Sequence, residues 1–277
     1  MKIKKIKLLA GAMIIAMIGA VFTGCGNNST SNDGTVTITV SGSTSVGPLM
    51  EKIAEKYEEE NSNISIEINQ TGSSAGIKDA MDGISQIGMS SRDLKDEEAA
   101  KVKATVLAYD GVAVITNTGN SVKELTIGQI RDIFTGKITN WSEVGGSNAS
   151  IVVVSREAGS GTRTAFEEGV EYSEEELVKD AIISKGNGDV KTTVSTNENA
   201  IGFVSFEYVD DAISSINVNG IEPTAANVKA GSYALSRPFL AVTNEQYITE
   251  DSQKLIDYIT SEEGQQIVED NKLITID

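Results

Sequence analysis

Three places in the chain combine a predicted strand, a turn rich in glycine, serine and threonine, and a predicted helix. The strands are indicated by alternating or continuous apolar residues and end at Val40, Ile68 and Val154. The turns that follow are residues 41–45, 69–76 and 155–162. Alternating strands and helices are typical of a mainly parallel sheet with helices on both faces, so we expect an α/β fold.

Two further strand-like segments, residues 111–116 and 238–243, flank a long block with its own predicted strands and helices. This arrangement predicts that the chain leaves one lobe, builds a second and returns to the first. We expect lobe I to comprise residues 36–115 plus 237–277 and lobe II to comprise residues 116–236. The two flanking segments would then be the crossover strands that form a hinge.

The N-terminus is typical of a bacterial secretory signal rather than of a folded domain. Lysines 2, 4, 5 and 7 precede an uncharged apolar run, residues 8–22, that is too short for a comfortable transmembrane helix. The run ends just before Cys25, the only cysteine of the chain. We expect residues 1–24 to be a signal peptide and Cys25 to carry a diacylglyceryl lipid anchor. The alternative is an ordinary cleaved signal with an incidental cysteine.

Residues 25–35 are small and polar, which predicts a flexible tether between the lipid-anchored Cys25 and the domain. Without residues 1–24 the chain has 19 basic and 40 acidic residues, a net charge of −21. Such a charge argues against nucleic-acid binding and against attraction to an anionic membrane surface. Any bound anion must therefore be held by local groups.

Each of the three turns has the features of an anion site. The first N–H groups of a helix have no partner within the helix, and the helix dipole adds partial positive charge there. Glycine allows close approach, and the hydroxyl groups of serine and threonine add donors. Arg156, in the third turn, has a planar guanidinium that suits a tetrahedral oxyanion. The alternative is that these serines and threonines only cap helices.

Several kinds of catalytic or cofactor site are unsupported by the sequence. The chain has no histidine, which excludes a Ser-His-Asp triad and leaves zinc only carboxylate ligands. It has no nucleotide P-loop and no complete dinucleotide fingerprint. We therefore expect binding rather than catalysis, with no metal and no cofactor.

In its motifs the sequence resembles the phosphate-binding (PstS-type) subunit of bacterial phosphate ABC transporters. The resemblance covers essentially all of the chain after the signal, and five stretches carry it: SGSTSVGP at residues 41–48, TGSSAGIK at 71–78, IGMSSR at 87–92, IRDIFTGKITNW at 130–141 and VVSREAGSGTR at 153–163. It implies a two-lobed periplasmic-binding-protein-like fold of type II, with two crossover strands as hinge.

The resemblance also implies a set of phosphate-binding residues in the three turns. They are Thr44, Ser45, Ser73, Arg156, Ser160, Gly161 and Thr162. Longer family members have an aspartate at the position of Ser91, where it accepts the proton of the ligand. Ser91 and its neighbour Arg92 remain candidate contacts, although a serine at position 91 supplies no carboxylate acceptor.

A carboxylate that faces the ligand would accept the proton of phosphate and repel sulfate, which has none. We expect Asp110, just before the first crossover segment, to be this acceptor. Alternatively, Asp110 pairs with Arg92 or Arg156, or caps a turn. Arg92 in turn either touches phosphate or braces Asp110.

The resemblance implies an extracytoplasmic receptor, lipid-anchored on the cell membrane, that delivers inorganic phosphate to ABC permease subunits. We expect a monomer. The alternatives are a receptor for another tetrahedral oxyanion such as sulfate or phosphonate, a surface phosphatase, and an adhesin that binds no small anion.

Overall fold

The structure is a computed structural model that describes residues 34–276. The predicted signal peptide, Cys25 and nearly all of the predicted tether lie outside the described residues. Among these residues, no helix combines the length and the apolar character that crossing a membrane requires.

Lobe I begins with three parallel strands in the order β2, β1, β3. Their bounds are Val36–Gly42 for β1, Ile64–Asn69 for β2 and Ile87–Ser90 for β3. Ile38 and Val40 of β1 are fully buried, as the alternating pattern predicts. Helices α1 (Gly47–Glu60) and α2 (Ser73–Asp82) follow β1 and β2, and the short α3 (Asp96–Ala99) follows β3.

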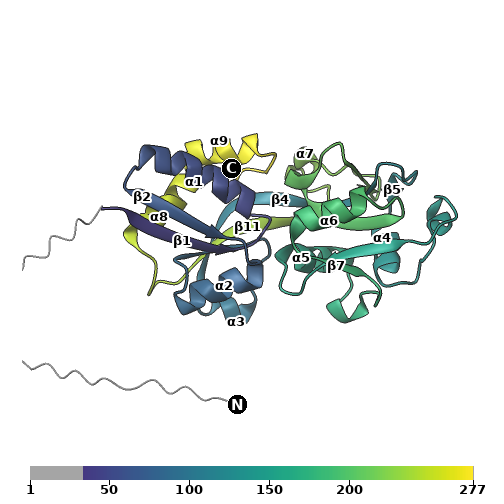
Figure 1. Cartoon of the computed structure of the whole chain (residues 1–277), viewed down its shortest axis with the longest axis horizontal. Coiled ribbons are helices and arrows are strands. Elements are labelled where there is room, and N and C mark those ends of the chain that lie inside the picture. The colour runs from purple at the N-terminus through teal and green to yellow at the C-terminus, as the bar shows by residue number, and fades with distance from the viewer. Residues whose placement is uncertain (1–33, 277) are drawn as a thin grey trace, which may run out of the picture. The chain divides into compact units, whose positions relative to one another are not determined.

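Strands β4 (Lys103–Asn117) and β11 (Ser236–Thr243) are the two crossover strands. The first half of β4 pairs antiparallel with β11, with Asp110 opposite Arg237 and Gly111 opposite Ser236. The second half pairs antiparallel with β8 of lobe II. Figure 1 shows β4 and β11 running together between the two lobes.

The sheet is therefore mixed rather than mainly parallel, with the strand order β2-β1-β3-β11-β4-β8-β6-β7. β11 is antiparallel to both β3 and β4, whereas β6 is parallel to β7 and β8. β9 also pairs with β4, and β5 and β10 form a small separate sheet.

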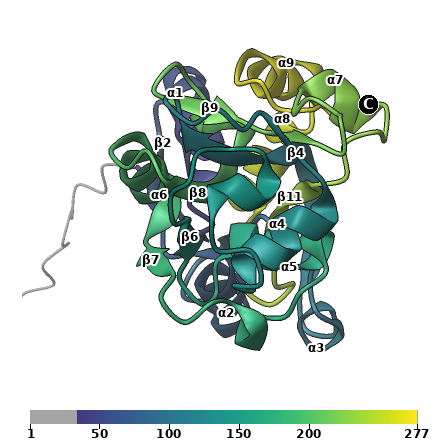
Figure 2. The same ribbon diagram turned by 90° about the vertical axis from the view of Figure 1, so that its right-hand side faces the viewer.

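The strands of lobe II are β5 (Glu124–Leu125), β6 (Val152–Arg156), β7 (Ile182–Ser184), β8 (Ala200–Ser205), β9 (Ile213–Ser215) and β10 (Asn217–Val218). Its helices are α4 (Ile127–Phe134), α5 (Gly161–Val170), α6 (Gly186–Ser195) and α7 (Ala225–Lys229), with 3-10 turns η1 (Trp141–Val144), η2 (Glu174–Glu176) and η3 (Phe206–Tyr208). In Figure 2, α4 and α5 lie to one side of β6 and β8, and α6 lies to the other. The chain ends in lobe I with α8 (Glu250–Ile259) and α9 (Glu262–Asp270).

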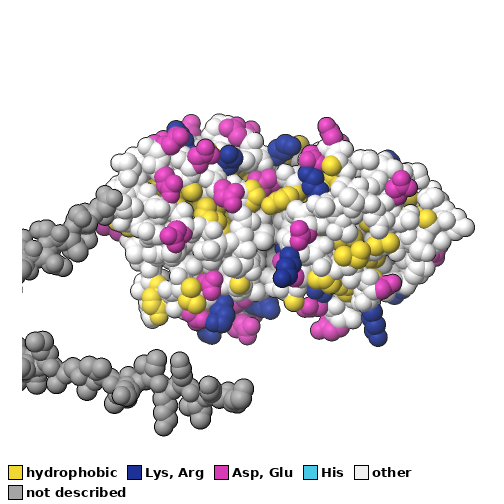
Figure 3. Space-filling view, in the orientation of Figure 1, with side chains coloured by type: hydrophobic (Ala, Val, Ile, Leu, Met, Phe, Trp, Pro, Cys, Tyr) yellow, Lys and Arg dark blue, Asp and Glu magenta, His cyan; other side chains and the backbone are white. Residues whose placement is uncertain are grey.

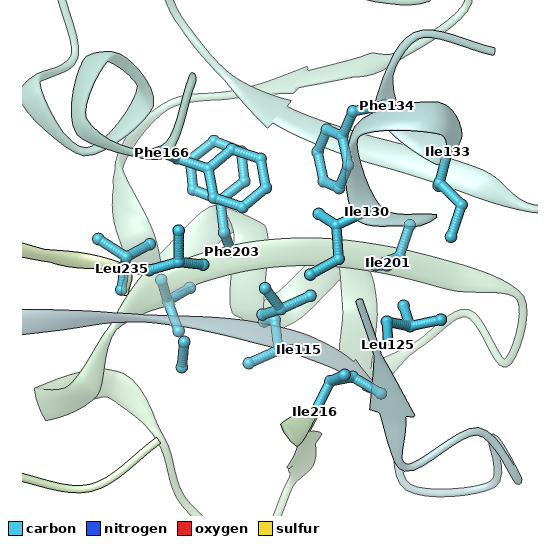
Figure 4. Packing of buried hydrophobic residues seen from close by; sticks show 14 of the residues in the cluster. Ile115, Leu125, Ile130, Ile133, Phe134, Phe166, Ile201, Phe203, Ile216 and Leu235 are labelled. Atoms are coloured by element: carbon cyan, nitrogen blue, oxygen red, sulfur yellow. The ribbon is translucent and has the colours of Figure 1, made fainter. Parts of the chain in front are cut away.

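The buried apolar side chains divide between the two ends of the molecule. One cluster extends from Val112 to Leu235 along the chain and contains the stacked rings of Phe166 and Phe203 (Figure 4). Two others are built from residues before 109 and after 238. Residues 112–115, which the sequence assigns to lobe I, pack in the first cluster because β4 continues into lobe II.

Trp141 is buried in this first cluster, and its indole N–H donates to the Asn199 carbonyl at 3.0 Å. Trp141 therefore has a packing role in this cluster. Acidic and basic side chains are interspersed on the face of the molecule that Figure 3 shows, and exposed glutamates of α1 are among them.

Candidate anion-binding site

The turn between β1 and α1 places two serine hydroxyls in the interior. Ser43 Oγ accepts hydrogen bonds from the N–H groups of Ser45 and Val46 at 3.1 and 3.3 Å. Ser43 thus satisfies two N–H groups of the turn that precedes α1. Ser45 is fully buried, and its Oγ lies 2.8 Å from Oγ1 of Thr162 in lobe II. The first turn therefore presents the Ser45 hydroxyl to the opposite lobe.

The second turn and the end of β3 contribute a chain of hydroxyl groups. Ser73, the first residue of α2, accepts from the N–H of Ser91 at 3.1 Å. The two hydroxyl oxygens are 3.3 Å apart, and Ser43 Oγ donates to Ser91 Oγ at 2.9 Å. A Cβ on Gly161 would lie 2.3 Å from Ser73 Oγ. Only glycine allows the backbone of α5 to come so close to these hydroxyls.

The third turn is the start of α5 in lobe II. Ser160 is the N-cap residue, and its Oγ accepts from the N–H of Arg163 at 3.3 Å. The N–H groups of Gly161 and Thr162 donate no hydrogen bond to any part of the chain that the structure describes. These two donors, at the positive end of the helix dipole, are available to an anion.

Arg156 connects the third turn to the first. Its side chain is almost completely buried, and it donates from Nη2 to Thr44 Oγ1 at 3.2 Å and from Nη1 to Thr162 Oγ1 at 3.4 Å. Nε and Nη2 also donate to the two carboxylate oxygens of Glu157, both at 2.8 Å. Burial acts to raise the pKa of Glu157, but hydrogen bonds and charge from Arg156 lower it overall. Arg156 therefore stays oriented between the lobes by a charged partner.

A fourth strand-turn-helix unit, absent from the sequence-based prediction, completes the group. β7 ends at Ser184, and the buried Asn187 lies in the first turn of α6. Its Nδ2 donates to Ser45 Oγ at 2.9 Å, and its Oδ1 accepts from the Ser205 N–H at 3.1 Å. The signal is present as Lys185-Gly186-Asn187-Gly188 after two isoleucines, but the strand has only three residues.

Asp110 is completely buried and pairs with Arg237, on the other crossover strand. Its Oδ2 accepts from Arg237 Nε and Nη2 at 3.1 and 2.8 Å, and its Oδ1 accepts from the Phe206 N–H at 3.3 Å. Burial raises the pKa of Asp110, and the charge of Arg237 opposes that rise. The suggested pairing of Asp110 with Arg92 or Arg156 is wrong, because β11 places a different arginine directly opposite it.

Arg92 is buried, but its guanidinium points to α3 and not to Asp110. Nη1 and Nη2 donate to the carboxylate oxygens of Glu98 at 2.8 and 2.9 Å, and Nη2 also donates to Ser74 Oγ at 3.2 Å. The hydrogen bonds from Arg92 lower the pKa of Glu98 against the effect of its burial. The suggestion that Arg92 braces Asp110 is therefore wrong, and its contact with a ligand stays a prediction.

The structure thus brings most of the predicted residues into one group of contacts. Those that share hydrogen bonds or close approach are Thr44, Ser45, Ser73, Ser91, Gly161, Thr162 and Arg156. Ser160 caps α5 next to this group. Asp110 is linked to the group by its ion pair with Arg237, which also donates to Ser45. The sequence-based prediction missed Asn187 and Arg237.

The chain matches the PBP superfamily domain over residues 27–263. It is 30% identical to the phosphate-binding protein PstS of Borreliella burgdorferi over 95% of this chain and 98% of the relative. It is 31% identical to PstS of Bacillus subtilis, over 100% of this chain and 95% of the relative. The chain belongs to the PstS family of phosphate-binding proteins. This membership confirms the resemblance inferred from the five sequence stretches.

Solved structures of the PstS type share the fold. One from Clostridium perfringens, described as a phosphate ABC transporter substrate-binding protein with bound phosphate, is 56% identical, with a TM-score of 0.86 over 87% of this chain and 100% of that chain. An ABC-type phosphate transport receptor from Vibrio cholerae is 35% identical, with a TM-score of 0.74 over the same shares. The predicted two-lobed periplasmic-binding-protein fold is therefore confirmed.

The described part of this PstS-family chain contains no group of three or more acidic, cysteine or histidine side chains arranged to hold a metal ion. What converges between the lobes is a set of hydroxyl, amide and guanidinium donors. Such a set can hold an oxyanion by hydrogen bonding.

Proposed function

We propose that this protein binds inorganic phosphate between lobe I and lobe II and delivers it to an ABC-type phosphate importer. The observation that carries the proposal is that Ser45, just before α1, and Thr162, in the first turn of α5, meet each other and Arg156 at the end of β6. The N–H groups of Gly161 and Thr162, which have no hydrogen-bond partner among residues 34–276, add two donors. The names of the PstS relatives and the phosphate-bound relative from Clostridium perfringens support phosphate as the anion.

We propose that lobe I and lobe II close on the ligand by bending at β4 and β11, with the first lobe boundary within β4, before residues 112–115. Several hydrogen bonds connect the lobes directly, among them Ser74 N–H to Gly159 O at 3.1 Å and Tyr208 O–H to Thr44 O at 3.2 Å. Contacts of this kind exist only when the lobes meet, so a ligand that bridges them favours the closed state. The closed state is the form that we expect the permease to receive.

The selectivity for phosphate over sulfate is assigned to Asp110. Its Oδ1 accepts from the Phe206 N–H at 3.3 Å, and a carboxylate oxygen can accept more than one hydrogen bond. Phosphate at neutral pH carries a proton that can serve as this donor, whereas sulfate does not. We therefore expect Asp110→Asn to reduce the preference for phosphate over sulfate.

The location follows from the predicted N-terminus. We propose that residues 1–24 are removed as a signal peptide, that Cys25 carries the lipid anchor, and that residues 25–35 form the tether. The protein would then act as a monomer on the outer face of the cell membrane. Mass spectrometry of the mature N-terminus tests this part, and an unmodified Cys25 would contradict it.

We propose binding without catalysis, because the chain has no histidine and the candidate site offers donors rather than a nucleophile with its base. Hydrolysis of a phosphate ester by the purified protein would refute this.

The function is tested by titration calorimetry of the phosphate-stripped protein. We expect Arg156→Ala to weaken phosphate binding by about 10- to 100-fold, because hydrogen bonds to a charged ligand are lost. Arg131→Ala, which changes a half-exposed arginine on α4, is the matched control and should bind as the unaltered protein does. Equal affinities for Arg156→Ala and the control would contradict the assignment.

A further inference from the structure

Arg237 lies where the chain re-enters lobe I, and its side chain is 1% exposed. Besides Asp110, it donates from Nη2 to Ser45 Oγ at 3.0 Å and from Nη1 to the Ser91 carbonyl at 3.5 Å. Its guanidinium also lies 5.5 Å from the centre of the Phe239 ring. Arg237, on β11, therefore contacts Asp110 of the other crossover strand, Ser45 in the first turn and Ser91 at the end of β3.

A buried ion pair of this kind needs a reason, since well-packed apolar residues of similar volume are often equally stable. The pair is not required to connect β4 and β11, because the backbone ladder already joins them. What the pair adds is an oriented cation beside Ser45. The contact between Arg237 and the Ser45 hydroxyl is therefore the feature that the backbone ladder does not supply.

Ser45 Oγ accepts hydrogen bonds from two nitrogen groups that can act only as donors. One is Arg237 Nη2 at 3.0 Å and the other is Asn187 Nδ2 at 2.9 Å. A hydroxyl oxygen has two acceptor lone pairs and one proton. Arg237 and Asn187 together occupy both lone pairs, so the Ser45 O–H can only donate. It points to Thr162 Oγ1, 2.8 Å away, or to an anion oxygen placed between the lobes.

We propose that Arg237, together with Asn187, is a positioning and specificity residue that holds Ser45 as an obligatory hydrogen-bond donor to the bound anion. Asp110 fixes the guanidinium in place for this role. The inference rests on the proposed phosphate binding and adds to it two residues that act through Ser45. A ligand oxygen that carries no proton is favoured at this position, because Ser45 has no acceptor to offer.

The test is a set of double-mutant cycles in which each change is made with and without Ser45→Ala. The phosphate affinity of each variant is measured by titration calorimetry. The ion pair is replaced as a unit by Asp110→Asn/Arg237→Gln, which leaves no unpaired buried charge. We expect this change to weaken phosphate binding at least tenfold when Ser45 is present. In the Ser45→Ala background the loss should be several-fold smaller, because the target of Arg237 is gone and only the loss of the Asp110 acceptor remains. Equal losses in both backgrounds, or no loss in either, would overturn the proposal.

Asn187→Ala provides a second cycle that leaves the ion pair intact, and it should show the same dependence on Ser45. An equal loss of phosphate affinity on Asn187→Ala with and without Ser45 would also overturn the proposal. Thermal unfolding of each variant checks that the fold is retained, and Arg131→Gln serves as a control with unchanged binding. If the unaltered protein binds no phosphate, the proposed function itself fails. If it binds phosphate but neither cycle shows coupling, only the inference fails.

Discussion

Glu207 lies in η3, directly after β8, and is expected to make the stability of the protein depend on pH. Its Oε2 is buried and has no hydrogen-bond partner among residues 34–276. Burial, followed by the negative charges of Asp110 and Glu51, raises the pKa of Glu207 from 4.5 to about 8. In the folded protein this carboxyl therefore keeps its proton at neutral pH, whereas in the unfolded chain it ionises at an ordinary pKa.

The direction of the pH dependence follows from this difference in pKa between the folded and unfolded states. Between pH 4.5 and about 8 the folded state binds more protons than the unfolded state, so this group lowers stability as the pH rises. The slope is roughly 1.4 kcal/mol per pH unit. Glu207→Gln, which cannot ionise, should therefore raise the free energy of unfolding by roughly 3 kcal/mol at pH 7. Near pH 4.5 it should change that free energy little.

Urea unfolding followed by the fluorescence of Trp141 measures this, because the only tryptophan is buried in the same core cluster as Phe206. The difference between Glu207→Gln and the unaltered protein should grow steadily from pH 5 to pH 8. Glu245→Gln, at an exposed position, should show no such growth. A constant difference for Glu207→Gln across this range would refute the reasoning.

Two further predictions concern packing. Phe166→Ala removes a buried ring stacked on Phe203 at 4.0 Å, and it should cost about 3–5 kcal/mol of unfolding free energy in urea; a loss below about 1 kcal/mol would mean that the core readily refills the space. Gly161→Ala should weaken phosphate binding at least tenfold in calorimetry, because its Cβ would lie 2.3 Å from Ser73 Oγ. Gly188→Ala, whose Cβ meets nothing within 4 Å, should bind normally, and identical behaviour of the two alanine variants would contradict this steric argument.

Much of the fold could be predicted because local patterns determine it. Alternating apolar residues in 36–40 and 64–68 identified β1 and β2, and the helix predicted after the first turn is α1. The direction of strands could not be obtained in this way. A period of two is the same in parallel and antiparallel strands, so the antiparallel places of β8 and β11 were missed.

The length of β4 was also underestimated. Residues 111–116 were recognised because they form a continuous apolar run, whereas residues 103–110 mix charged and apolar residues. Their strand conformation is supported by pairing with β11, which is far away in the sequence. Long-range pairing of this kind leaves no local pattern.

The candidate site was predictable where a turn carries its own signal. Ser45, Ser73 and Thr162 all follow predicted strands and precede predicted helices, and the structure brings them together. Arg237 carries no such signal, since it lies inside a strand and its partner Asp110 is 127 positions earlier. Which arginine faces Asp110 is decided by the register of β4 and β11, and the sequence alone does not give that register.

The central claim, phosphate binding between the lobes, is tested most directly by equilibrium dialysis of the stripped protein against labelled phosphate, with and without excess sulfate. We expect one phosphate bound per chain, displaced by unlabelled phosphate and retained in a large excess of sulfate. Absence of bound phosphate, or its displacement by an equal concentration of sulfate, would contradict the account.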